Sequence, residues 1–156
     1  MIKINLIAVG RVKEGYFSQG IDEYAKRLKK YCDFKITEIK EENLRSESPA
    51  EIARALEGEG AEIMKAAGGE FYVFAIEGKQ FSSEEFAKFI SDKIDEGKEI
   101  RLVIGSSHGL SNEVKKAAAG KISFSKMTLP HTLFRLVCCE QIYRAFTIIG
   151  GATYHK

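Results

Sequence analysis

The sequence predicts an α/β protein with a mainly parallel sheet, and three observations lead to this fold class. Segments with the composition of strands alternate five times with segments of helical periodicity. Helix-start signals and glycine stops punctuate the alternation. No internal repeat, linker or low-complexity segment interrupts it. Such alternation is typical of helices packed on a parallel sheet, and 156 residues suit a single domain spanning residues 1–156.

The first third of the chain predicts a strand, a helix and a second strand. Residues 2–9, IKINLIAV, alternate and then become continuously apolar, which favours a strand; no small-residue cleavage site follows, so a signal peptide is not expected. Apolar residues then recur every three or four positions from 17 to 31, as on one face of a helix. Residues 34–39 suit a second strand, and the polar stretch 40–49 is expected to be a flexible loop.

A capping signal predicts where the second helix begins. Ser48 is expected to cap it, Pro49 suits its first position, and Glu51 completes a capping box. The helix is expected to end at Gly68. Residues 70–76, EFYVFAI, then have the composition of a buried strand.

The same pattern is repeated in the next unit. Ser82 and Glu85 form a second predicted capping box, and Gly97 is expected to stop that helix. Residues 100–105, IRLVIG, follow as the fourth strand.

The last third predicts a short helix, a short strand and a long helix. Ser111 can cap a helix that is expected to end at Gly120. Residues 122–124 suit a final strand, and the last helix is expected to begin near Pro130.

Three strand exits are the places where a ligand is expected, because ligands of parallel α/β sheets bind beyond the carboxyl ends of the strands. The exits read AIEGKQFSSEE, VIGSSHGLSNE and SFSKMTLPH. Glycine allows close approach of a ligand to the backbone, and helix N-termini offer free N–H donors. The GSSHG stretch is neither a dinucleotide fingerprint nor a phosphate loop, so it is either a ligand loop or a simple strand-to-helix turn.

The predicted last helix is apolar on more than one side. A surface helix needs a stripe of about 100°, and the apolar positions here cover more. The helix therefore needs its own sheet on one side and either more of the same chain or a second copy on the other. We expect a homodimer, with Ile142 or Phe146 facing the partner. The apolar positions are Leu133, Leu136, Val137, Cys139, Ile142, Tyr143, Phe146 and Ile149.

Charge and cysteine usage narrow the class of protein. Residues 115–156 carry seven Lys or Arg side chains and one acid, Glu140, which suits a polyanionic partner or reflects ordinary solvated lysines. Cys32, Cys138 and Cys139 have no disulfide or metal spacing, so we expect reduced thiols, no metal and a cytoplasmic location. No apolar run approaches the roughly 20 residues of a membrane span.

The motifs VIGSSHGLS, SFSKMTLPHTLFRLVCCEQIYRAFTIIGGATYHK, AIEGKQFSSEEFA and IKINLIAVGRVKEGY together resemble the RlmH family over essentially the full length. The ordered set TLPH, EQxYRA and YHK is specific to it. The resemblance implies a SPOUT-class methyltransferase that uses S-adenosyl-L-methionine (SAM) to methylate N3 of a pseudouridine in the 23S ribosomal RNA of the large subunit. It also implies helices on both faces of the sheet, a trefoil knot at the C-terminal region, and pairing of two copies through that region.

The resemblance assigns cofactor contacts by position. Phe74 occupies a contact position where relatives often have leucine, and Gly105 matches a SAM-contacting glycine. Ser106 stands where the family usually has a second glycine, and a serine fits there if its φ is negative and its side chain points away. A loop is expected to surround the adenine and methionine parts of SAM with its backbone. It consists of Phe124, Ser125, Lys126, Met127, Thr128 and Leu129.

Four residues are candidates for the catalytic step, which must align the methyl group with N3 and remove its proton. Arg144 either grips a phosphate or base carbonyl or pairs with Glu140, four residues away. His155 is a proton acceptor or RNA ligand, or else a frayed terminal residue. His131 either takes part or orients the loop. Tyr154 completes the set.

Two other functions compete with the enzyme. A non-catalytic RNA-binding α/β protein would explain the basic C-terminal quarter, and SAM binding would separate the two. A nucleotide-binding α/β domain of another class would explain the strand–glycine–helix turns, but the phosphate signatures are absent. His108 is expected to be a solvent-facing turn residue or an RNA contact.

Overall fold

The computed structural model describes all 156 residues and contains one five-stranded sheet in the order β2-β1-β4-β3-β5. Every neighbouring pair of strands is parallel, as the alternation predicts. The strands are β1 (Lys3–Val9), β2 (Asp33–Ile39), β3 (Tyr72–Gln80), β4 (Ile100–Ile104) and β5 (Gly120–Ser123). The helices are α1 (Gly15–Leu28), α2 (Pro49–Ala67), α3 (Ser83–Asp95), α4 (Asn112–Ala117) and α5 (His131–Ile149).

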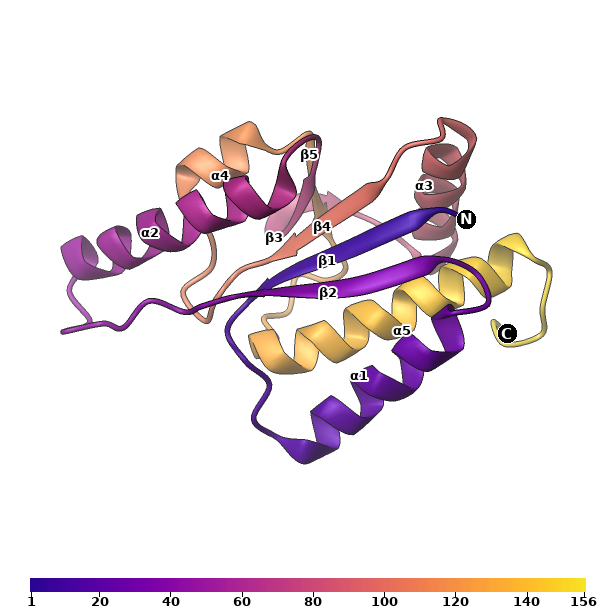
Figure 1. The fold of residues 1–156 in the computed structure, drawn as a ribbon, viewed down its shortest axis with the longest axis horizontal. Helices are drawn as coiled ribbons and strands as arrows, with labels where there is room; N and C mark the ends of the chain where they lie inside the picture. The colour runs from indigo at the N-terminus through magenta and orange to yellow at the C-terminus, as the bar shows by residue number, and fades with distance from the viewer.

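Helices cover both faces of the sheet (Figure 1). α1, α3 and α5 lie on one face, with α5 against both α1 and α3, and α2 and α4 lie together on the other. Each face has its own core, and alternate residues of a strand point into each. On β1, Leu6 faces the α5 side and Ile7 faces the α2 side, and neither is exposed. Two-sided burial explains why the strands are continuously apolar in sequence.

Serine caps start three of the five helices. The hydroxyl oxygens of Ser48, Ser82 and Ser111 each accept a hydrogen bond from the backbone N–H three residues later. The predicted capping box at Ser48 is only half formed, because the Glu51 carboxylate accepts from Arg45 N instead of reaching back to Ser48. Gly68 ends α2 in the left-handed conformation, with φ of 63°.

Two predicted boundaries are wrong for reasons of pairing. β3 extends to Gln80 because it pairs with β5 on both sides of an irregularity between Phe74 and Lys79. Gly78 permits this path, since a Cβ there would lie 2.7 Å from the Lys121 carbonyl carbon. Gly120 does not end a helix: α4 stops at Ala117, and Gly120 pairs with Tyr72 as the first residue of β5.

Most of the second side of α5 packs against other elements of the same chain. Ile142 and Phe146, which we expected to face a second copy, are buried in the core beneath the sheet. α1 approaches so closely that a Cβ on Gly20 would lie 2.8 Å from Leu136 Cδ1. Leu133 and Val137 are half-buried and belong to neither core cluster, and Ile149 at the end of α5 is exposed, so a narrower apolar surface remains. The knot implied by the resemblance stays a prediction.

Candidate functional site

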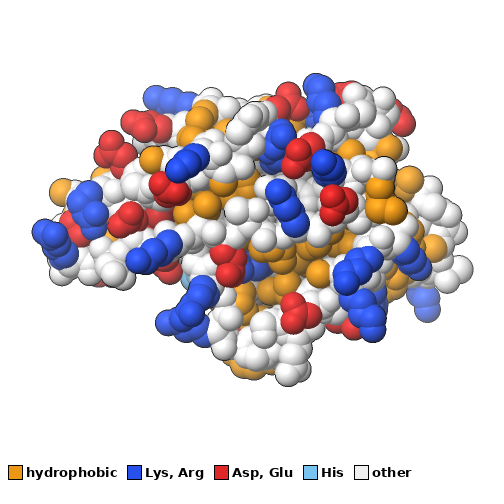
Figure 2. Space-filling model, in the orientation of Figure 1, with side chains coloured by type: hydrophobic (Ala, Val, Ile, Leu, Met, Phe, Trp, Pro, Cys, Tyr) orange, Lys and Arg blue, Asp and Glu red, His pale blue; other side chains and the backbone are white.

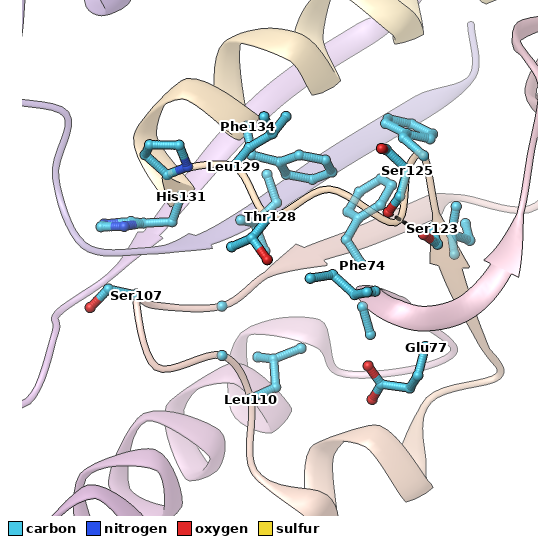
Figure 3. Close-up of a pocket in the computed structure, with 18 of the residues that line it drawn as sticks. Phe74, Glu77, Ser107, Leu110, Ser123, Ser125, Thr128, Leu129, His131 and Phe134 are labelled. Carbon is cyan, nitrogen blue, oxygen red and sulfur yellow. Dashed lines mark hydrogen bonds between the residues drawn. The ribbon is translucent and has the colours of Figure 1, made fainter.

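A cavity of about 630 Å³ lies beyond the carboxyl ends of β4 and β5 and beside the irregular middle of β3 (Figure 3). This volume is within the range of small-molecule sites. Seven of the eight predicted cofactor contacts line it, and so does His131, the first residue of α5. The exception is Lys126, which is exposed and does not line the cavity. The seven lining contacts are Phe74, Gly105, Phe124, Ser125, Met127, Thr128 and Leu129.

An aromatic wall bounds one side of the cavity. The Phe74 ring lies 5.0 Å from Phe124 and 5.1 Å from Phe134, measured between centroids. Phe124 in turn packs edge-on against the buried Phe86. Because these neighbours pack against the Phe74 ring, the larger volume of phenylalanine compared with leucine is accommodated within the aromatic wall. Phe134 was not predicted, because its role depends on where α5 begins relative to β3.

The loop after β4 is folded tightly onto Gly105. A Cβ at Gly105 would lie 2.4 Å from the Gly109 carbonyl oxygen, and Gly109 has a φ of 84°. The Gly109 amide donates to the Ser106 carbonyl at 2.9 Å and closes the turn. Both glycines are therefore required by the loop itself, whether or not a ligand is bound.

Ser106 has the negative φ that a serine needs in place of the family's usual second glycine. Only glycines in this chain have positive φ, so its backbone is unstrained. Its side chain is buried beside Glu59 of α2, which is 3% exposed, and its hydroxyl oxygen accepts from His108 N at 3.3 Å. Glu59 Oε2 accepts a hydrogen bond from Glu42 N at 3.0 Å. Burial raises the pKa of Glu59, while the hydrogen bond from Glu42 N partly opposes the rise.

The polar stretch 40–49 is thus tied to the cavity loop and is not a free loop. Besides the Glu59 contact, Glu47 Oε2 lies 2.9 Å from His108 Nε2. Arg54 of α2 donates to the Asn43 carbonyl at 2.9 Å. His108 is an exposed turn residue, as expected, and its contact with Glu47 links these two segments.

The loop after β5 presents backbone donors at the cavity. Ser125 Oγ accepts from Met127 N, and Ser123 Oγ donates to the Ser125 carbonyl, each at 2.9 Å. The amides of Lys126, Thr128 and Leu129 donate no hydrogen bond within the chain. Thr128 points into the cavity in Figure 3. These free amides can therefore donate hydrogen bonds to acceptor atoms of a ligand.

An ion pair sits at the cavity. Glu77 Oε1 and Lys115 Nζ are 2.7 Å apart, and this contact lowers the pKa of Glu77. The sequence contained a signal for Glu77, which lies in the first strand exit, but none for Lys115 on α4.

Arg144, Tyr154 and His155 are not in this cavity. They meet at the far end of α5, which runs back toward the end of the molecule where both chain termini lie (Figure 1). His131 and Arg144 are 13 residues apart, or roughly 20 Å at the helical rise of about 1.5 Å per residue. Of the four catalytic candidates, the chain places one at the cavity and three together elsewhere.

The three distant candidates and Glu140 form a compact group, here called the tail cluster. Glu140 Oε1 accepts from Arg144 Nη2 at 2.6 Å and from the Tyr154 hydroxyl at 3.1 Å. His155 Nδ1 lies 3.1 Å from Arg144 Nη1, and His155 Nε2 lies 2.7 Å from Glu84 Oε1. The expected Arg144–Glu140 pair therefore forms, and His155 is held rather than frayed. Burial raises the pKa of Tyr154, with hydrogen bonds to Tyr24 and Glu140 as further causes.

Comparisons with known proteins agree with the fold and the cavity. Residues 2–155 match the family model described as "Predicted SPOUT methyltransferase", and the chain is therefore an enzyme of the SPOUT methyltransferase class. Ribosomal RNA large subunit methyltransferase H of Limosilactobacillus reuteri (strain DSM 20016) is 50% identical over 159 residues, covering 99% of this chain and 100% of the relative. The chain belongs to this methyltransferase H family of SPOUT enzymes.

A second relative supports the same family, and two solved structures share the fold. Ribosomal RNA large subunit methyltransferase H of Streptococcus mutans (strain ATCC 700610 / UA159) is 48% identical with the same coverage. A probable methyltransferase from Bordetella pertussis Tohama I shares the fold, with a TM-score of 0.57 at 11% identity, covering 92% of this chain and 96% of that one. TrmJ from Z. mobilis ZM4 has a TM-score of 0.52 at 12% identity, covering 94% and 70%.

SPOUT methyltransferases use SAM, and the cavity suits it. An apolar aromatic wall, unpaired backbone donors and one charged pair match a ligand that combines a planar base, a ribose and a zwitterionic chain. No helix in the chain is long and apolar enough to cross a membrane. No cluster of three or more His, Cys, Asp or Glu side chains is placed to hold a metal ion.

Proposed function

We propose that this chain transfers a methyl group from SAM to N3 of a pseudouridine in large-subunit ribosomal RNA. The family and its relatives' names support the reaction and the substrate. The observation that carries the proposal is the convergence on one cavity of seven residues from β3 and from the segments that follow β4 and β5. A cytoplasmic location is part of the proposal, since ribosomes are the substrate.

The loop 124–129 and the aromatic wall would hold the cofactor. The amides of Thr128 and Leu129, which donate no hydrogen bond within the chain, would bind the acceptor nitrogens of an adenine, and Phe74 would offer an apolar contact. When bound, SAM supplies a methyl group that is already electrophilic because it is attached to a sulfonium. The residues of the chain then have three tasks: to align the base, to exclude water and to accept a proton.

We propose further that the enzyme is a homodimer in which the tail cluster of one protomer completes the cavity of its partner. About 20 Å of α5 separate a protomer's own tail cluster from its own cavity. Leu133 and Val137 form a half-buried apolar face on α5, and Met127 and Leu129 leave 75% and 36% of their surface exposed beside the cavity. A second copy on this face would cover all four and bring its own tail near.

Within such a composite site, the tail cluster provides groups suited to the base. Arg144 can donate to a carbonyl or phosphate of the RNA, and His155 can accept the N3 proton. Tyr154 stays protonated at neutral pH because its pKa is raised, so it acts as a donor or a stacking surface rather than as a base. His131 borders the cavity, where it would either take part in the transfer or orient the loop between β5 and α5.

Methyl transfer from labelled SAM to ribosomes that lack the modification tests this function. We expect one methyl group per large subunit, mapped to N3 of a pseudouridine. Binding of ribosomes without transfer would favour the non-catalytic RNA-binding alternative, and transfer to another base or to protein would overturn the proposed substrate.

A further inference from the structure

We propose that the C-terminal part of α1 is the surface that holds the backbone of the substrate RNA. This surface, here called the α1 platform, consists of Lys26, Arg27, Lys29 and Lys30 with the rings of Tyr24 and Tyr143 beside them. The inference rests on the proposed function, since it names where the RNA lies once the target base is in a composite site.

The first observation is a group of positively charged side chains, most of which have no acidic partner. Four cations occur within five residues, and all four are exposed. Only Arg27 pairs with an acid, Glu23 at 3.0 Å, and the three lysines have no carboxylate within ion-pair distance. Figure 2 shows basic side chains gathered over this end of the molecule.

The lysines of α3 provide a contrast on the same face of the sheet. Lys88 pairs with Asp92 at 2.9 Å and Lys93 with Glu96 at 3.1 Å. Lys98, just after that helix, pairs with Glu96 at 3.0 Å. Cations at a helix C-terminus also complement its dipole, which accounts for one or two of the α1 charges but not for a run of four.

The second observation is that aromatic rings pack against two of these cations. The Arg27 guanidinium lies 5.2 Å from the Tyr24 ring centroid and 5.5 Å from that of Tyr143. Lys30 Nζ lies 4.9 Å from the Tyr31 centroid. Basic groups interleaved with aromatic rings suit an RNA strand, whose phosphates pair with the cations and whose unstacked bases pack on rings.

The third observation is continuity with the tail cluster. The Tyr24 and Tyr154 hydroxyl oxygens are 3.3 Å apart, and the Tyr143 and Tyr154 ring centroids are 4.9 Å apart. Figure 1 shows the end of α1 beside the last turns of α5 and the C-terminus. An RNA strand lying on the platform would therefore pass directly over Tyr154 and His155. The chemistry of this surface fits a phosphate backbone rather than an apolar partner.

The test compares two variants with the same change in charge. The platform variant carries Lys26→Glu, Lys29→Glu and Lys30→Glu; the control carries Lys65→Glu, Lys88→Glu and Lys98→Glu, which are exposed lysines elsewhere. Binding to undermethylated ribosomes is measured across salt concentrations, together with SAM affinity, melting temperature and the single-turnover rate at saturating ribosome.

We expect the platform variant to bind ribosomes at least about tenfold more weakly near 0.1 M salt and to lose about 2 to 3 units of the salt slope. Its SAM affinity and saturating rate should stay within about twofold of the wild type, and the control should change binding by less than about threefold. Equal binding by the wild type and platform variant would overturn the inference, as would equal losses in both variants. If the wild type binds ribosomes but transfers no methyl group, the proposed function is overturned. The comparison of ribosome binding between the platform and control variants still tests the inference in that case.

Discussion

Arg144 Nη1 and His155 Nδ1 lie 3.1 Å apart, although eleven residues separate them in the chain. A guanidinium only donates hydrogen bonds, so Nδ1 must accept, and Nε2 carries the hydrogen that faces Glu84. In this arrangement the lone pair of Nδ1 faces Arg144, and the other ring nitrogen faces Glu84. A substrate carbonyl that takes over Arg144 would release Nδ1 to accept a proton, which couples base recognition to proton removal.

This relationship predicts separate roles for the last residues. Deletion of Tyr154, His155 and Lys156 should leave SAM binding nearly unchanged and lower methyl transfer by about 10²–10⁴-fold, the usual contribution of general acid–base catalysis. His155→Ala should lower the saturating rate more than Lys156→Ala does. If both substitutions weaken ribosome binding and leave the saturating rate unchanged, the tail only binds RNA. A truncated enzyme with full rate and affinity would exclude both roles.

The cavity predicts a sharp difference between two neighbouring positions. Thr128→Trp should weaken SAM binding by about tenfold or more, because an indole placed at Thr128 occupies the cavity into which that side chain points. Lys126→Trp should bind SAM like the wild type, since Lys126 does not line the cavity. Calorimetric titration measures both. Unchanged SAM binding by the Thr128 variant would mean that the cofactor site lies elsewhere.

The half-buried apolar face of α5 predicts which substitutions give monomers. Leu133→Asp with Val137→Asp should dissociate the dimer, because burial of each such side chain contributes about 1.5–3 kcal/mol. Met64→Asp, at an exposed apolar position on α2, should remain dimeric. Aspartate at Ile142 or Phe146 should instead unfold the chain, since both lie in its core. Sedimentation of a monomeric wild type at micromolar concentration would exclude the dimer.

Glu59 predicts a dependence of stability on pH. Its folded pKa is raised by burial, so its contribution is most favourable below the unfolded pKa and is lost as pH rises through the folded value. Glu59→Gln removes this penalty while retaining a carbonyl to accept from Glu42 N. Urea unfolding should show the variant gaining stability relative to the wild type between pH 4 and pH 7.5. The exposed Glu62→Gln should show no such trend, and a constant difference for Glu59→Gln would contradict the account.

The sequence was sufficient for what depends on local pattern. Periodicity identified every strand and helix, and the serine caps at Ser48, Ser82 and Ser111 marked three helix starts that the structure confirms. The exits of parallel strands identified the cavity, because carboxyl ends of parallel strands meet at one edge.

Contacts between distant segments were not predictable in this way. Arg135 is 3% exposed, pairs with Glu38 and donates to the Gly10 carbonyl, 125 residues away. Nothing local marks a lysine or arginine for such burial. The same holds for the position of α5 between α1 and α3 and for Glu59 beneath Ser106. Each depends on the order in which strands lie in the sheet, which alternation alone does not define.

Mixed dimers test most directly the central claim that the cavity of one chain works with the tail cluster of its partner. At a SAM concentration well below the Kd of the Thr128→Trp chain, this chain and a chain lacking residues 154–156 should each lose most of their methyl transfer when assayed alone. An equal mixture, dissociated and reassembled, should recover about a quarter of wild-type methyl transfer to ribosomes, because half of the dimers are mixed and each has one intact site. Both variants must first be shown to dimerise. Mixed dimers that form and remain inactive would contradict the account.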